Sequence, residues 1–127
     1  MITIKNLNKF YGRQHVLHDI NLQLEQGQCI GFVGPNGCGK TTLMKCILGL
    51  ATPQSGEVLV DGMNVQENPS YRRHIGFMPQ NSCFPENMSV GETFRTIRDV
   101  RKDSDNLDKE LYDAFEIEAI AGKKTKT

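Results

Sequence analysis

The stretch that decides the fold is GPNGCGKTT, residues 34–42. It matches G-x-x-x-x-G-K-[ST], a pattern in which glycines let the backbone curl until several N–H groups point inward at one anion. A continuous apolar run, residues 29–33, precedes it, and apolar residues at helical spacing follow it. The order of strand, glycine-rich loop and helix predicts a phosphate-binding loop, because the free N–H groups and the dipole of a helix start favour negative charge.

Residues of this loop are the predicted nucleotide ligands. Lys40 is expected to place its charge on the β- and γ-phosphates, and Thr41 is expected to offer its hydroxyl to Mg²⁺. Thr42 is expected to contact a phosphate oxygen. The predicted cofactor-binding residues in the loop are Asn36, Gly37, Cys38, Gly39, Lys40, Thr41 and Thr42. The motif alone predicts only a nucleoside-phosphate site, since kinases, GTPases and transport ATPases all use it.

The segments before the loop show two hydrophobic patterns. Residues 2–5 alternate apolar and polar, and so do residues 20–25. A period of two is typical of half-exposed strands in antiparallel pairs. The unbroken apolar run at 29–33 instead predicts a strand buried on both faces, within a sheet that helices flank.

Downstream of the loop the pattern becomes helical and then returns to short strands. Leu43, Ile47 and Leu50 form a predicted core-facing stripe, and Gly49 is expected to stop the helix. A turn at residues 53–56 leads into a predicted strand over 57–60, and Asp61-Gly62 predicts another turn. Residues 75–78 are predicted as a strand that ends at Pro79.

The last third of the chain is predicted to be helical. Ser89 and Glu92 form an S-x-x-E capping box, and Phe94 and Ile97 begin an apolar face. A charged break is expected over 98–105, followed by a helix over about 106–121 that ends at Gly122. Its predicted apolar side consists of Leu107, Leu111, Ala114 and Phe115. Residues 123–127 offer no apolar anchor and are expected to be a solvated end or part of a loop.

Composition excludes several classes of function. Fifteen basic residues balance fifteen acidic ones, so there is no general attraction to nucleic acid or to anionic lipid. No apolar run approaches the roughly 20 residues that span a bilayer, and the N-terminus lacks the features of a signal peptide. Membrane contact is therefore expected only through a partner. The cysteines, at 29, 38, 46 and 83, lack metal-site spacing and are expected to be reduced thiols.

Four blocks, taken in order, resemble the ATP-binding cassette of ABC transporters along nearly the whole chain. The first is KFYG at 9–12, the second is the loop itself, and the third is GLATPQSGEV at 49–58, followed by Asp61-Gly62. The fourth is IGFMPQ at 75–80, which is similar to the segment that ends in the glutamine of the Q-loop. Each block is weak or moderate alone, whereas all four in the same order are specific.

The resemblance implies roles for residues outside the loop. Tyr11 is expected to stack on the adenine, an interaction worth about 1–3 kcal/mol with little dependence on the base, and Val16 to line the same pocket. Gln80 is expected to be catalytic together with Lys40, reaching Mg²⁺ or the attacking water when the site closes. Phe84, Met88 and Phe94 either face a membrane subunit or pack together as a small helical core.

The resemblance also implies a fold and partners. The fold is α/β: an incomplete P-loop NTPase core with an N-terminal antiparallel β-subdomain over 1–80, then the Q-loop and the start of the helical subdomain over 81–127. The implied cofactors are ATP and Mg²⁺. The implied partners are a second ATP-binding subunit, in a dimer across the nucleotide, and a transmembrane permease, at the inner face of the cell membrane.

Several family motifs are not found in these residues. The signature motif, the second Mg²⁺ ligand, the catalytic glutamate and the switch histidine have no match, so a fragment that binds Mg-ATP but barely hydrolyses it is expected. Strands that would pair beside residues 29–33 are also expected to be missing. The alternatives are a soluble ABC-type ATPase without a membrane partner and a non-catalytic nucleotide-binding or dimerising fragment.

Overall fold

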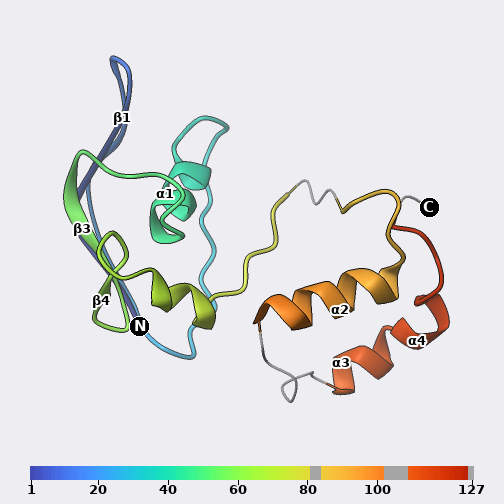
Figure 1. Cartoon of the computed structure of the whole chain (residues 1–127). Helices are drawn as coiled ribbons and strands as arrows, with labels where there is room; N and C mark the ends of the chain where they lie inside the picture. The colour runs from blue at the N-terminus through green and yellow to red at the C-terminus, as the bar shows by residue number, and fades with distance from the viewer. Residues whose placement is uncertain (81–83, 102–108, 126–127) are drawn as a thin grey trace. The chain divides into compact units, whose positions relative to one another are not determined.

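A computed structural model describes residues 1–80, 84–101 and 109–125. The chain divides into two compact units, Met1–Gly76 and Phe77–Thr127. In the described residues, the first unit holds a β-sheet, an α-helix and a 3₁₀ helix, and the second holds α-helices without a sheet. Figure 1 draws the first unit in blue to green and the helices of the second in orange to red. Within the described residues, no helix is long and apolar enough to cross a membrane.

The sheet of the first unit is antiparallel throughout. Its strands are β1 (Ile2–Tyr11), β2 (Gln14–Leu24), β3 (Ser55–Val60) and β4 (Met63–Asn64), in the order β2-β1-β3-β4. Ile2 pairs with Leu24 and Ile4 with Leu22, so the alternating apolar residues of the two first strands share one face. The predicted antiparallel β-subdomain is therefore confirmed.

One face of this sheet packs against α1 (Lys40–Ile47). The core combines residues of the strands with residues of the helix and of the segment after β4. Its buried members are Ile4, Leu7, Leu17, Leu43, Cys46, Ile47, Val58, Val60, Val65 and Tyr71. This core fixes α1 beside the sheet, and with it the loop that precedes the helix.

The helix ends where the glycine predicts. Gly49, at φ 64°, donates to the Cys46 carbonyl, and Leu50 donates to the Lys45 carbonyl, which together make a Schellman cap. The predicted stripe is correct for Leu43 and Ile47 and wrong for Leu50, which is 64% exposed. Leu50 lies beyond the cap, where the helical repeat no longer applies, and Cys46 is buried instead.

The predicted buried strand at 29–33 is wrong in this structure. The segment has no regular secondary structure, and Ile30 and Val33 are 41% and 99% exposed. A strand forms only where a neighbour completes its hydrogen bonds, and no strand of the described residues pairs with this segment. The predicted strand at 75–78 is wrong for the same reason, and Met78 is 89% exposed.

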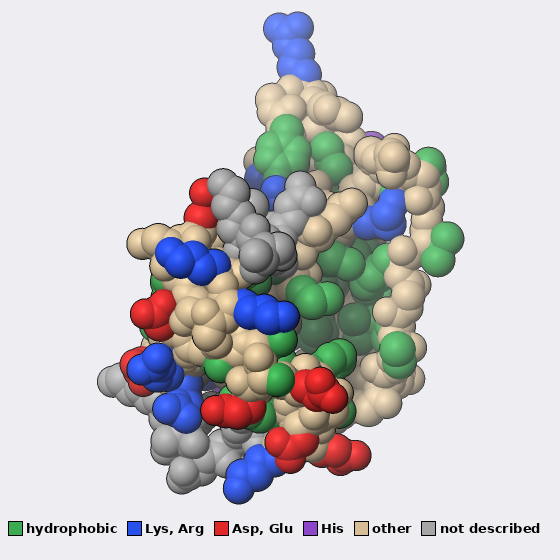
Figure 2. All heavy atoms as spheres, turned by 90° about the vertical axis from the view of Figure 1, so that its right-hand side faces the viewer, with side chains coloured by type: hydrophobic (Ala, Val, Ile, Leu, Met, Phe, Trp, Pro, Cys, Tyr) green, Lys and Arg blue, Asp and Glu red, His purple; other side chains and the backbone are tan. Residues whose placement is uncertain are grey.

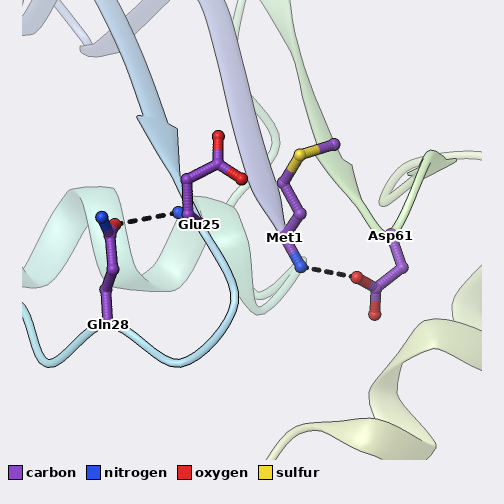
Figure 3. Close-up of polar contacts among 4 residues, drawn as sticks. All are labelled: Met1, Glu25, Gln28 and Asp61. Carbon is purple, nitrogen blue, oxygen red and sulfur yellow. Dashed lines mark hydrogen bonds and ion pairs between the residues drawn. The ribbon is translucent and has the colours of Figure 1, made fainter.

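Two turns shape the edges of the sheet (Figure 3). Asp61 and Gly62 have φ of 48° and 77°, which indicates a type I′ turn between β3 and β4 and confirms the predicted turn. The Asp61 carboxylate lies 2.6 Å from the Met1 ammonium, and the bond and charge of that ammonium lower the pKa of Asp61. After β2, the Gln28 side chain accepts a 3.0 Å bond from the Glu25 N–H.

A 3₁₀ helix that the sequence analysis did not predict, η1 (Pro69–His74), follows β4. The Asn68 side chain caps it by accepting from the Ser70 N–H at 3.0 Å. Arg72 donates to the carbonyl oxygens of Leu48 and Gly49, each at 3.1 Å, and so ties η1 to the end of α1.

The second unit contains α2 (Val90–Arg101), α3 (Lys109–Ala114) and α4 (Ile117–Ile120). The predicted capping box at the start of α2 is confirmed: the Ser89 N–H donates to the Glu92 carboxylate at 2.8 Å, and the Glu92 N–H donates to the Ser89 hydroxyl at 3.2 Å. The predicted break at Arg98 is wrong, because α2 continues to Arg101. Residues 102–105 lie outside the described residues.

The single helix predicted over about 106–121 is instead two short helices. Glu116 adopts a left-handed conformation, φ 48°, which ends α3 before α4 begins. Of the predicted apolar side, Leu111 and Phe115 are 54% and 69% exposed, and Ala114 is exposed too. Tyr112 makes the contact with α2, edge-on to Phe94 at 6.1 Å. Leu107 lies outside the described residues.

Backbone hydrogen bonds anchor the residues after Gly122, which contradicts the predicted solvated end and is consistent with the predicted loop. The Val90 N–H donates to the Lys123 carbonyl at 2.9 Å, and the Thr125 N–H donates to the Met88 carbonyl at 3.1 Å. These backbone bonds need no apolar side chain, which is why composition did not indicate them. Residues 126 and 127 lie outside the described residues.

Candidate nucleotide-binding site

The glycine-rich loop curls through two left-handed glycines. Gly37 and Gly39 have φ of 83° and 98°, values that L side chains rarely adopt. Between them, the Cys38 N–H donates to the Pro35 carbonyl at 3.4 Å. The loop therefore needs its glycines for its backbone path.

The loop delivers unpaired N–H groups to the start of α1. Gly39 is the N-cap and has no side chain to cap the helix, and the first turn has no acidic residue. The first helical bond runs from the Leu43 N–H to the Gly39 carbonyl, at 2.8 Å. The N–H groups of Lys40, Thr41 and Thr42 thus precede the helical ladder, which suits an anion.

The Lys40 side chain folds back over the loop. Its ammonium donates to the carbonyl oxygens of Gly34 and Pro35, at 2.7 and 2.8 Å, and lies 3.6 Å from the Cys38 sulfur. The structure therefore brings Lys40 and Cys38 together. It also holds the positive charge of Lys40 beside the loop that leads into the start of α1. No acidic side chain of the described residues forms an ion pair with this ammonium.

The loop rests on the β1–β2 hairpin. Gly39 lies against Val16 and Leu17 of β2, so Val16, predicted to line the base pocket, does border the loop. Tyr11 ends β1 in the same hairpin, pairs with Gln14 and is 48% exposed. An exposed aromatic ring is available for stacking on a planar ligand.

The remaining loop residues are accessible. Asn36, Gly37, Cys38 and Thr41 are exposed, whereas Thr42 is half-buried. Thr41 in the first turn offers the hydroxyl that a phosphate-bound Mg²⁺ takes as a ligand. No group of three or more His, Cys, Asp or Glu side chains in the described part of the chain could hold a metal ion. The residues fit a cation bound mainly through phosphates, with Thr41 as the protein ligand.

Two predicted features lie in the second unit. Gln80 is exposed and its role stays a prediction. Phe84 and Phe94 are 49% and 40% exposed and Met88 is half-buried, so these residues do not form a closed core by themselves. Figure 2 shows further apolar side chains at the surface.

Sequence reasoning missed Lys9 as a candidate site residue. It is 8% exposed, and its ammonium lies 4.9 Å from the centre of the Tyr11 ring. The one indication in the sequence was the two-residue spacing of Lys9 and Tyr11, because residues two apart on a strand share a face.

Comparison with known proteins connects this geometry to a family. The model of the ABC transporter family matches residues 17–126. An Fe(3+) ions import ATP-binding protein from Haemophilus influenzae is 39% identical over 94 residues, which cover 71% of this chain and 26% of the relative. A sulfate/thiosulfate import ATP-binding protein from Caulobacter vibrioides is 33% identical over 96% of this chain and 38% of its own length.

A third relative, a Nod factor export ATP-binding protein from Cupriavidus metallidurans, is 38% identical over 75% of this chain and 32% of its own length. The chain spans about a quarter to two fifths of the length of these relatives.

Solved structures agree with the sequence matches. An ATP-binding subunit of an ABC transporter superposes with a TM-score of 0.85 at 25% identity, over 98% of this chain and 54% of its own. A bacterial Atm1-family ABC exporter with ATP bound gives 0.71 at 29% identity, over 77% of this chain and 18% of its own. The predicted fold class, an incomplete P-loop NTPase fold with an antiparallel β-subdomain, is confirmed. The chain therefore belongs to the ATP-binding family of ABC transporters.

Proposed function

We propose that these residues bind ATP with Mg²⁺ in the loop 34–42. The observation that carries the proposal is the start of α1, where the N–H groups of residues 40–42 have no helical partner and the Lys40 ammonium lies over the loop. The exporter with ATP bound, which is similar over 77% of this chain, supports ATP as the nucleotide.

Each loop residue has a proposed role. Lys40 exchanges bonds to its own loop carbonyls for bonds to the β- and γ-phosphates, and the backbone of 36–42 surrounds the phosphates. Thr41 gives its hydroxyl to Mg²⁺, and Thr42 contacts a phosphate oxygen. Bound Mg²⁺ neutralises phosphate charge. Tyr11 stacks on the base, with Val16 beside it.

We further propose that the whole protein is the energy-coupling ATPase of a transporter. Its partners would be a second ATP-binding subunit across the nucleotide and a membrane permease at the cytoplasmic face. The proposed contact of the second unit with the permease is a groove of about 290 Å³, lined by apolar side chains such as Phe94 and Ile117 and by charged ones such as Arg98 and Glu118. The relatives include importers and an exporter, so they favour no cargo or direction.

For these 127 residues taken alone, we propose binding with little turnover. Catalysis of phosphoryl transfer rests on positioning and charge stabilisation. Gln80 is the proposed water- or Mg²⁺-contacting residue, but no residue here matches the family's catalytic glutamate or signature motif. Phosphate release from Mg-ATP at a rate well above that of buffer would contradict this part of the proposal.

The binding proposal is tested by calorimetric titration with Mg-ATP. Lys40→Ala should weaken binding at least tenfold, because lost charge-assisted bonds are worth about 1.5–3 kcal/mol. Lys45→Ala is the matched control, since Lys45 is exposed in the last turn of the same helix and should leave affinity unchanged. Equal effects of both substitutions, or no binding by the unaltered chain, would sink the proposal.

A further inference from the structure

Lys9 is the one charged residue among the described residues that the fold buries, with 8% of its surface exposed. Removing an ammonium from water is costly unless partners replace its hydration. An apolar side chain of the same length would fill this place at lower cost, so the charge itself calls for an explanation.

The partners of the ammonium are a carbonyl and a ring. Lys9 Nζ donates to the Thr52 carbonyl at 2.7 Å and lies 4.9 Å from the centre of the Tyr11 ring, within the range of a cation–π interaction. The ion pairs found among the described residues join Met1 to Asp61 and Lys5 to Glu57. Lys9 therefore forms no ion pair with the described carboxylates, and its ammonium contacts the Thr52 carbonyl and the Tyr11 ring.

The surrounding backbone fixes this arrangement. The Gln54 side chain accepts from the Phe10 N–H at 2.8 Å and donates to the Phe10 carbonyl at 3.3 Å. The Gln54 N–H also donates to the Asn8 carbonyl at 3.0 Å. The end of β1 is thus hydrogen-bonded on both sides of Lys9 to the segment that follows α1. Tyr11, two residues further along, is 48% exposed.

We propose that Lys9 is a positioning residue for the nucleobase. Its ammonium holds one face of the Tyr11 ring, and the opposite face is presented to a purine. A ring that is already oriented loses less conformational freedom when the base binds, which raises affinity. The proposal rests on the proposed function, because it assumes that Tyr11 stacks on the base. It predicts that Lys9 affects binding of the base and does not affect binding of the triphosphate.

The test compares two ligands that differ in the base. Binding of Mg-ATP and of Mg-tripolyphosphate is measured by calorimetry for the 127-residue chain, for Lys9→Met and for Lys9→Gln. Methionine keeps the length of the stem, and glutamine keeps a donor for the Thr52 carbonyl. Each variant should bind ATP about threefold to tenfold more weakly, whereas tripolyphosphate affinity should stay within about twofold. In a Tyr11→Leu background the same substitutions should have no further effect on ATP.

The outcomes separate the two proposals. Unchanged affinity for ATP in both variants overturns the role of Lys9. Equal loss of affinity for ATP and for tripolyphosphate in both variants also overturns it, because that result would show that Lys9 is purely structural. If the unaltered chain binds tripolyphosphate as tightly as ATP, stacking of the base on Tyr11 is overturned, whereas phosphate binding by the loop is retained. An unaltered chain that binds neither ligand overturns the proposed function itself.

Discussion

Gly39 and Leu17 lie so close together that a β-carbon on Gly39 would be 2.9 Å from Leu17 Cδ2. The same β-carbon would be 3.1 Å from the Val16 carbonyl oxygen, which belongs to backbone and cannot turn aside. The last glycine of the phosphate loop is thus also the point where the loop seats on β2. One residue serves both the curl of the loop and its packing on the sheet.

Gly39→Ala should therefore damage both stability and binding. The left-handed backbone at φ 98° and the contact with β2 both oppose a side chain, so we expect a loss of about 2–4 kcal/mol in the free energy of unfolding. Gly37→Ala is the control, because φ is 83° there but no atom lies within 4 Å of the added carbon. Urea unfolding should show the smaller loss for Gly37→Ala, and equal losses would remove the packing role of Gly39.

The second prediction concerns Tyr71 in the core of the first unit. Its side chain is fully buried, and its hydroxyl has no hydrogen-bond partner among the described residues. Tyr71→Phe removes this unpaired group while keeping the ring, so the free energy of unfolding should stay within about 0.5 kcal/mol or rise by about 1 kcal/mol. Tyr71→Ala, which leaves a cavity, should cost about 3–5 kcal/mol. A marked loss in Tyr71→Phe under urea would show that the hydroxyl is bonded.

The third prediction concerns the pH dependence of the capping box at Glu92. The bonds from the Ser89 backbone and side chain lower the pKa of Glu92 below its ordinary value of 4.5. A lowered pKa means that the charged carboxylate is stabilised by folding, so its contribution is complete above 4.5 and is lost as pH falls through the lower folded value. The hydrogen-exchange protection factors at the start of α2, which are the intrinsic rates divided by the observed rates at each pH, should therefore fall over this acidic range.

Glu92→Gln is the control for that experiment, since it cannot titrate and its protection factors should depend less on pH over the same range. The folded pKa itself is measured by following the Glu92 carboxyl carbon by NMR. A midpoint at or above the ordinary value would contradict the capping box as the cause.

The elements that sequence patterns predicted well are those whose determinants are local. The alternation in β1 and β2, the glycine stop at Gly49 and the capping box at Ser89 each depend on residues a few positions apart. The phosphate loop belongs to the same class, because its glycines and the following helix start define its path.

The predictions that failed depend on distant partners. Residues 29–33 have the composition of a buried strand, but pairing requires a neighbour that no local pattern supplies. The break at Glu116 and the anchoring of Lys123 and Thr125 come from backbone conformation and backbone bonds, which side-chain periodicity does not report. Lys9 escaped notice because a lysine on a strand is usually solvated.

Cysteine reactivity provides the last prediction. Cys46 is fully buried, and burial raises the pKa of its thiol, an effect that the charge of Lys9 only partly opposes. Cys29 and Cys38 are exposed. Because the thiolate is the reactive form, iodoacetamide should alkylate Cys46 at least about tenfold more slowly than the two exposed cysteines. Peptide mass spectrometry reads each site separately, including Cys83, which lies outside the described residues.

Denaturant should abolish the difference between the sites, which distinguishes protection by the fold from an intrinsic difference between peptides. Bound Mg-ATP should slow Cys38, which lies in the loop, and leave Cys29 unchanged, so the same time course also reports on occupancy of the proposed site. Cys46 reacting as fast as Cys29 in the folded chain would mean that α1 does not pack on the sheet as described. The contact of the phosphate loop with β2 would then be lost as well, because the packing of α1 on the sheet holds the start of α1 against β2.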